Sequence, residues 1–281
     1  MRKIKKILNN NREEITHNDN STPIFIKYGK QIPKEYISDI WYTLKEQQHF
    51  DSFNYVQNQP ELNEKMRAIL IDWLVDVHHK FKLQTETLYL AVSIIDRYVN
   101  KKTIQRNKYQ LLGITALFIA SKFEEIFYPD LDNYVYVTDN TYLKKEILAM
   151  ERDIVNVLHF QISFPSSLRF FEIIALNYNF NEIEFMYGKY LLELFLVHPK
   201  VYKQSIIAIS VCYIIMKLNN YSNYHELYSL LTGDESSKQV KECAKEIYDY
   251  LQKVETLQFK AVFNKYSKDR YLKVSLMGMN K

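Results

Sequence analysis

One run near the middle of the chain constrains the fold more than any other feature. Residues 109–122 read Tyr-Gln-Leu-Leu-Gly-Ile-Thr-Ala-Leu-Phe-Ile-Ala-Ser-Lys, and only the small residues Gly113 and Thr115 interrupt the apolar side chains between 111 and 120. A helix that is apolar on every side has to be enclosed by other helices, and this run is too short to span a bilayer, which needs ~20 apolar residues. A buried strand has the same pattern, but the length and the alanines favour a helix. The sequence therefore predicts an enclosed helix that delivers Lys122 and the charged residues after it to the surface.

Composition supports an all-helical chain with short connections. Five Gly and six Pro among 281 residues leave little material for hairpins and tight turns. The net charge of +4 is small and evenly scattered, so we expect neither nucleic acid nor membrane as a partner. The basic start at residues 1–6 has no apolar signal core behind it, which argues against secretion; it is either a weak nuclear-targeting patch or a solvated end. Cys212 and Cys243 stand in apolar surroundings, as expected of buried free thiols in a reducing compartment.

Apolar spacing divides the chain into helical segments. A stripe at helical spacing predicts a helix from Pro33, which suits a first turn, to about Gln48. Asn63 opens a long amphipathic helix, Thr85 is a candidate cap for the next one, and Asp139 or Thr141 is expected to start the last helix before a break at Pro165. The expected divisions are a flexible N-terminal tail, an N-terminal helix with its linker, a first and a second helical domain, and a C-terminal tail: 1–32, 33–62, 63–162, 163–275 and 276–281.

The second half repeats the pattern of the first. A shift of 95 positions lays residues 113–122 on residues 208–217, and again an apolar run ends in a lysine. Paired positions are chemically alike: Ile114 with Ile209, Thr115 with Ser210, Phe118 with Tyr213, Ile119 with Ile214, and Lys122 with Lys217. Chance similarity between two apolar helices is the alternative explanation. We interpret the match as two helical domains of like design in tandem.

The constellations that carry catalysis are missing from the sequence. There is no glycine-rich phosphate loop, no metal-binding His or Cys spacing, and no assignable Ser/His/Asp set. Asp72 and Asp76 share a helical face, but such pairs are usually solvated surface. We therefore expect no cofactor, no metal and no enzymatic activity, and favour a scaffold that acts by binding.

Four sequence blocks carry a resemblance to a known family. They are Met-Arg-Ala-Ile-Leu-Ile-Asp-Trp-Leu-Val-Asp-Val at 66–77, Leu-Ala-Val-Ser-Ile-Ile-Asp-Arg-Tyr at 90–98, Ala-Ser-Lys-Phe-Glu-Glu at 120–125, and Tyr-Val-Thr-Asp-Asn-Thr-Tyr at 136–142. In this order and spacing they resemble the A- and B-type mitotic cyclins, and are closest to the B type. The resemblance, which covers roughly residues 33–275, implies an all-α fold of two tandem five-helix cyclin boxes with an extra N-terminal helix. It also implies a regulatory subunit in the nucleus and cytoplasm that binds and activates a cyclin-dependent protein kinase at G2/M.

Five positions that define the first cyclin box are present: Arg67, Asp96, Leu111, Lys122 and Glu151. We expect Arg67 and Asp96 to form a buried structural pair, which costs ~3–5 kcal/mol to break by removing one partner.

The resemblance assigns the kinase contact to the end of the enclosed helix and its neighbours. The implied kinase-binding residues are Lys122, Glu151, Phe123, Glu124, Ile126, Val155, Phe160 and Ile40. From periodicity alone, a rim salt bridge worth ~0–1 kcal/mol beside ordinary core side chains is the favoured reading of any single residue; the family resemblance reverses that preference for the set.

The resemblance also implies a shallow groove that docks Arg-x-Leu segments of substrates or inhibitors. Its residues would be Met66, Ile69, Leu70, Trp73, Asp76, Gln110 and Asp139. Most of the apolar members fall on one helical face, but such a stripe is more often simply core. Exposure of Met66, Ile69 and Leu70 distinguishes the two readings.

The chain departs from the family pattern in two places. Phe-Tyr-Pro-Asp stands at 127–130 where the family usually has Tyr-Pro-Pro-Glu, and residues 1–32 contain no recognisable Arg-x-x-Leu destruction box. A competing hypothesis is a cyclin-fold transcription factor, which a strongly basic stripe on one box would favour; neither box has one in sequence. Contacts of the second box are not assigned.

Overall fold

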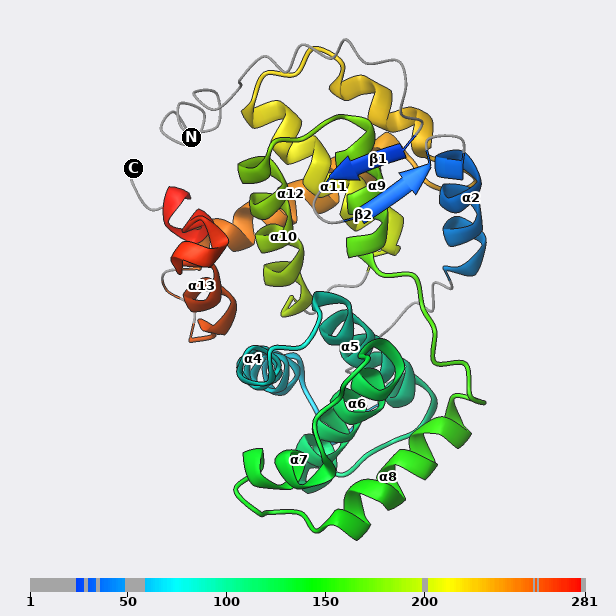
Figure 1. The fold of residues 1–281 in the computed structure, drawn as a ribbon, viewed down its shortest axis with the longest axis vertical. Helices are drawn as coiled ribbons and strands as arrows, with labels where there is room; N and C mark the ends of the chain where they lie inside the picture. The colour runs from blue at the N-terminus through cyan, green and yellow to red at the C-terminus, as the bar shows by residue number, and fades with distance from the viewer. Residues whose placement is uncertain are drawn as a thin grey trace.

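The computed structural model describes residues 24–27, 30–33, 36–48, 59–198, 202–254, 256 and 258–278. Figure 1 shows two bundles of helices, with α2 beside the second. None of the helices in these ranges is long and apolar enough to cross a membrane.

The N-terminal region contains a strand pair that the sequence did not predict. Strands β1 (Ile24–Lys27) and β2 (Lys30–Pro33) pair antiparallel, and helix α2 (Ile37–Gln47) follows. The prediction that a helix starts at Pro33 is wrong, because Pro33 ends β2; a residue without an amide hydrogen is tolerated on an edge strand as well as in a first helical turn. The rest of the predicted tail, residues 1–23, and linker residues 49–58 lie outside the described residues.

The first bundle is built around the predicted enclosed helix. Its elements are α4 (Glu64–Phe81), α5 (Thr85–Lys101), η2 (Arg106–Lys108), α6 (Tyr109–Glu124), α7 (Leu131–Val137) and α8 (Lys144–Val157). Every residue of α6 from 111 to 121 is buried, and α6 packs against α4, α5 and α8. At Gly113 an added Cβ would lie only 2.6 Å from Leu70 Cδ1. The glycine therefore lets α4 approach α6 closely.

Helix starts in this bundle follow the sequence only in part. α4 begins where the sequence placed it, at Asn63, whose side chain caps the helix by accepting the Met66 N–H at 2.9 Å. Thr85 is not a cap: it is the first residue of α5, and Gln84 stands at the cap position without a side-chain bond. The expected start of α8 at Asp139 or Thr141 is also wrong, because Asp139 and its neighbour have positive φ angles and the helix begins at Lys144.

The second bundle repeats the enclosed helix. Its elements are α9 (Ser167–Asn177), α10 (Glu182–Leu196), α11 (Gln204–Leu218), η3 (Tyr224–Leu230), α12 (Ser237–Lys253), α13 (Ala261–Tyr266), η4 (Asp269–Tyr271) and η5 (Val274–Gly278). Helix α11 packs against α9, α10 and α12, as α6 does against its own neighbours. The segment after α11, Tyr224–Leu230, forms a 3-10 helix, η3.

Arg67 joins the two bundles. Its Nε and Nη2 donate to Asp96 at 2.9 and 2.7 Å, which is the predicted pair. Its Nη1 also donates to the carbonyl oxygens of Leu196 and His198, at 2.9 and 3.2 Å, near the end of α10. One side chain therefore aligns α4 with α5 and satisfies carbonyls of the second bundle that the end of its helix leaves free.

A second charged group between the bundles is fully buried. Glu193 of α10 accepts hydrogen bonds from Lys265 Nζ at 2.5 Å and from the Tyr266 hydroxyl at 2.9 Å. Burial alone would raise the pKa of Glu193, but Lys265 and the hydrogen bonds hold it below its ordinary value. Nearby on α4, burial and then Lys265 lower the pKa of His78 to about 4, so its imidazole is neutral. Its Nε2–H donates to the Gln84 carbonyl at 2.8 Å.

Candidate functional site

The end of α6 carries the most prominent ion pair at the surface of the first bundle. The Lys122 ammonium pairs with the carboxylate of Glu151 on α8, and it lies 4.3 Å from the ring centroid of Phe118 one turn earlier. The two charged side chains are 33% and 18% exposed. The pair is therefore only partly shielded from solvent and remains open to a partner.

Large apolar side chains stand exposed around this pair. Their exposed fractions are 53% for Phe123, 89% for Ile126, 93% for Phe127 and 73% for Phe160. We call Lys122, Glu151 and these four residues the α6-end surface. Apolar area of this kind on a soluble protein usually marks an interaction site. Phe127 was not among the predicted residues, although it follows Ile126 directly and belongs to the departure from the family pattern at 127–130.

Three further predicted residues are less open. Glu124 and Val155 are partly buried, at the end of α6 and on α8 respectively. Ile40 is partly buried on α2, which packs against α9 of the second bundle.

Backbone geometry presents Phe160 outward. After α8 ends at Val157, His159 and Phe160 have φ angles of 50° and 59°, a region that costs ~1–2 kcal/mol for a residue with a Cβ. The turn is held by the Phe160 N–H, which donates to the Val155 carbonyl at 2.8 Å. The Phe160 ring is 73% exposed, so it buries little apolar area and contributes little stability to offset the strained turn.

Glu125 fixes the segment that carries Ile126 and Phe127. Its Oε1 accepts the Gln84 N–H at 2.7 Å and the Thr87 hydroxyl at 2.5 Å, so it caps α5 in place of Thr85. Sequence reasoning missed this role, because Gln84 and Thr87 lie about forty residues away and no local spacing signals the contact.

The predicted docking groove is only partly at the surface. Ile69 is 50% exposed, whereas Leu70 is 5% exposed and packs against Gly113. Leu70 therefore fails the exposure that the docking prediction requires, because the glycine draws α6 over it. The other predicted members are partly or fully exposed: Met66, Trp73, Gln110, Asp76 and Asp139.

The described residues hold no group of three or more His, Cys, Asp or Glu side chains that could bind a metal ion. Asp72 accepts the Ala261 N–H at 2.9 Å and joins α4 to α13; burial raises its pKa. Cys212 and Cys243 are free and buried.

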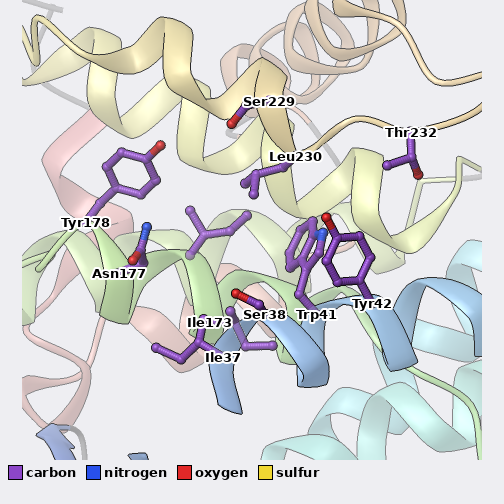
Figure 2. A pocket seen from close by; sticks show the side chains of 11 residues that line it. Ile37, Ser38, Trp41, Tyr42, Ile173, Asn177, Tyr178, Ser229, Leu230 and Thr232 are labelled. Carbon is purple, nitrogen blue, oxygen red and sulfur yellow. The ribbon is translucent and has the colours of Figure 1, made fainter. Parts of the chain in front are cut away.

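A pocket of about 190 Å³ lies between α2, α9 and η3. Figure 2 shows Trp41 and Tyr42 near Leu230, with Asn177 and Tyr178 toward the other end. Ligand sites usually measure ~300–1,000 Å³, so this pocket is small for a cofactor.

The chain forms two tandem helical bundles, each wrapped around an enclosed helix. At the end of one enclosed helix, an ion pair lies among exposed apolar side chains. These features define a helical scaffold with an interaction surface. Family models agree: "Cyclin, N-terminal domain" matches residues 39–163 and "Cyclin, C-terminal domain" matches residues 155–279. The chain belongs to the cyclin family. This confirms the resemblance read from the four blocks and the fold of two tandem cyclin domains.

Relatives with curated descriptions narrow the similarity to the mitotic type. The chain is 37% identical to "G2/mitotic-specific cyclin-B" of Spisula solidissima over 95% of this chain and 61% of the relative. It is 36% identical to the cyclin-B of Hydra vulgaris over 86% and 68%, and 39% identical to "G2/mitotic-specific cyclin cig2" of Schizosaccharomyces pombe over 79% and 54%. The chain thus spans less than two thirds of the length of several of these relatives.

Solved structures show the same fold at low sequence identity. A viral cyclin from herpesvirus saimiri matches with a TM-score of 0.65 and 17% identity, over 77% of this chain and 96% of the other. A chain of the yeast RNA Pol II CTD kinase CTDK-1 complex matches with a TM-score of 0.56 and 16% identity, over 88% and 83%.

Proposed function

We propose that the chain is a regulatory subunit that binds and activates a cyclin-dependent protein kinase and thereby controls passage from G2 into mitosis. The observation that carries this proposal is the Lys122–Glu151 pair among exposed apolar side chains. The names of the B-type relatives support the cell-cycle role, and solved neighbours that are parts of kinase complexes support the kinase partner. Such a role places the chain in the nucleus and the cytoplasm.

The surface suits a grip on another protein's backbone. A lysine ammonium has three donor hydrogens and a carboxylate has several lone pairs, so both groups keep hydrogen-bonding capacity after they pair with each other. Charge-assisted bonds to carbonyl and amide groups of the kinase would fix its orientation, while the four exposed apolar side chains supply the area that leaves water.

Activation then follows as a population shift. Protein kinases work only when a lysine–glutamate pair is completed by the inward position of their αC helix. A subunit that binds only the inward state stabilises it, and a difference of ~5.5 kcal/mol moves a kinase from about 1% to about 99% competent. In this scheme the chain supplies no reacting group; it stabilises the inward position of the kinase αC helix.

The test removes the pair and keeps the fold. Lys122→Ala with Glu151→Ala is expected to weaken activation of a purified cyclin-dependent kinase at least about 10-fold in histone phosphorylation, since such contacts contribute ~1.5–3 kcal/mol each. The matched control is Lys203→Ala with Asp234→Ala, a surface pair of the second bundle at 2.5 Å, which should change nothing. Wild-type activation by the folded Lys122/Glu151 variant would overturn the proposal.

Recruitment of Arg-x-Leu substrates is a second proposal for the face of α4. It is favoured by Ile69, a core-type side chain left 50% exposed between the partly exposed Met66 and Trp73. The acidic residues Asp76 and Asp139, both exposed, would face the arginine of the segment. Met66→Ala with Trp73→Ala should reduce phosphorylation of an Arg-x-Leu substrate and spare a short peptide substrate. Equal loss on both substrates would mean that the variant damages the fold instead.

A further inference from the structure

Positive charge gathers where the last turn of α4 meets η4. Lys268, just before η4, and Arg270 on η4 are exposed, and His79 of α4 is partly exposed beside them. We call His79, Lys268 and Arg270 the basic patch. It shares no residue with the α6-end surface or with the predicted docking groove.

Lys268 and His79 contact each other directly, and Arg270 is linked to them through the ring of Tyr271. Lys268 Nζ donates to His79 Nε2 at 2.7 Å. The Arg270 guanidinium lies 4.8 Å from the ring centroid of Tyr271, and that ring lies 6.2 Å from the His79 ring. The basic patch is therefore one cluster rather than a scatter of surface cations.

The loop that carries the cations is fixed by its own backbone. The Tyr271 N–H donates to the Lys268 carbonyl at 3.0 Å, and the Leu272 N–H donates to the Asp269 carbonyl at 2.8 Å. Leu272 and Lys273 then turn the chain with φ angles of 55° and 51°. The backbone that presents the two cations is therefore ordered before any ligand arrives, which removes that part of the ordering cost of binding.

Among the described residues, no carboxylate forms an ion pair with Lys268 or Arg270. The adjacent Asp269 pairs with Lys273 at 2.8 Å. Burial, followed by the charges of Lys268, Lys265 and Arg270, lowers the pKa of His79, and only Glu193, which is bonded to Lys265, opposes them. Lys268 donates its hydrogen bond to the imidazole of His79 and not to a carboxylate. The cluster therefore carries a positive potential that an anion would relieve.

We propose that the basic patch binds the phosphate group of a phosphoserine or phosphothreonine in a segment of another protein. A phosphate monoester carries a charge of about −1.5 to −2 and three strong acceptor oxygens, which match an ammonium, a guanidinium and an imidazole N–H. Nucleic acid fits less well, because it is bound by long basic stripes that make ~6–10 phosphate contacts, whereas this cluster is compact. Identifying the segment as a kinase substrate rests on the proposed function; the binding itself requires only this chain.

The experiment measures binding to the chain without any kinase. The probe is a fluorescein-labelled peptide Ala-Ala-Gly-pSer-Gly-Ala-Ala, with its unphosphorylated form as the reference. Lys268→Gln with Arg270→Gln should weaken binding at least about 10-fold, because charge-assisted hydrogen bonds are the strong ones. The matched control removes two lysines that are exposed elsewhere, Lys101→Gln with Lys245→Gln, and should bind as wild type does. The charge-preserving variant Lys268→Arg with Arg270→Lys should bind better than the glutamine variant.

A second readout reports on His79 directly. In NMR titrations of the imidazole, saturating phosphopeptide should raise the pKa of His79, because a dianion beside the ring favours its charged form. The unphosphorylated peptide should leave the titration unchanged.

Several outcomes would overturn the inference. They are absence of phosphopeptide binding at millimolar concentration, equal binding by the glutamine variant, and an unchanged His79 titration. Tighter binding of a single-stranded dT oligonucleotide, lost in the same variant, would assign the basic patch to nucleic acid and reject the phosphopeptide. Kinase activation by the glutamine variant is measured separately and should equal wild type. A failed phosphopeptide-binding experiment therefore leaves the proposed kinase activation standing, and a failed activation experiment leaves the phosphopeptide result standing.

Discussion

The C-terminal ends of α6 and α11 occupy matching positions in a repeated design, yet the lysine at each end has different partners. At the first, Lys122 pairs with Glu151 and lies over Phe118. At the second, Lys217 lies 3.7 Å from the ring centroid of Tyr224 and 5.8 Å from that of Tyr213. The lysine and its stacking on the residue four positions earlier are common to both ends. The acidic partner is replaced by aromatic rings.

What surrounds each end differs even more. The first bundle exposes large apolar side chains at its α6 end, whereas no large apolar side chain among the described residues of 163–275 is exposed. Helix η3 packs against α11 and brings Tyr224 and Tyr228 to its end. In a repeated design, one copy has thus left its end open, and the other has covered it with its own chain.

Two ion pairs are buried more deeply than the one at the end of α6. The Lys265–Glu193 pair within the second bundle and the Lys45–Glu235 pair between α2 and that bundle have side chains no more than 8% exposed, against 33% and 18% for Lys122–Glu151. Buried pairs are costly to break and exposed pairs contribute little to stability. The comparison therefore predicts that breaking Lys265–Glu193 costs much more stability than breaking Lys122–Glu151.

The largest effect is expected from breaking a buried pair. Glu193→Ala leaves Lys265 buried without its partner and should lower the free energy of unfolding by ~3–5 kcal/mol, measured by urea denaturation. The exposed counterpart, Glu151→Ala, should lower it by only ~0–1 kcal/mol. Similar losses from both variants would erase the contrast between the bundles.

An effect of about 3 kcal/mol is expected from pH. His78 has a pKa of about 4 in the folded chain against 6.5 when exposed, so between these values the unfolded chain binds more protons. Its contribution is present above pH 6.5 and is lost as pH falls toward 4, at up to ~1.4 kcal/mol per pH unit. Lys265, Glu193 and His79 face the same ring, and the lowered pKa values of Glu193 and His79 act in the same direction. Urea denaturation across this range should show a smaller slope for His78→Gln, and an unchanged slope would show that His78 is not the group responsible.

The smallest effect sharpens the contrast in binding. Ile126→Ser, at a side chain 89% exposed, should leave stability within ~0.5 kcal/mol. It should weaken kinase binding about 10-fold, because interface hot spots are apolar or aromatic side chains that become fully buried. The matched variant in the second bundle, Tyr228→Ser, should leave kinase binding unchanged in the same calorimetric titration. Equal weakening by both would mean that the kinase also covers the end of α11.

The features readable from sequence were those encoded in local pattern. The enclosed helices follow from unbroken apolar runs, and the start of α4 follows from Asn63, whose side chain bonds three residues ahead. The Arg67–Asp96 pair and the Lys122–Glu151 pair came from the family resemblance, and the structure places both together.

What was missed depends on contacts between distant segments. Glu125 caps a helix that begins forty residues earlier, and Glu193 meets Lys265 across 72 positions. Leu70 has the spacing of a surface stripe, but close approach at Gly113 buries it. Propensity and periodicity describe one helix at a time, so they do not register what a neighbouring helix covers or which charge it brings.

The bonds of Arg67 to Asp96 and to the carbonyls of Leu196 and His198 have a geometric consequence. Because one guanidinium bonds to both bundles, Arg67 restrains how one is placed against the other. A ligand on one bundle and a ligand on the other would then keep a separation set in part by Arg67, which need not touch either.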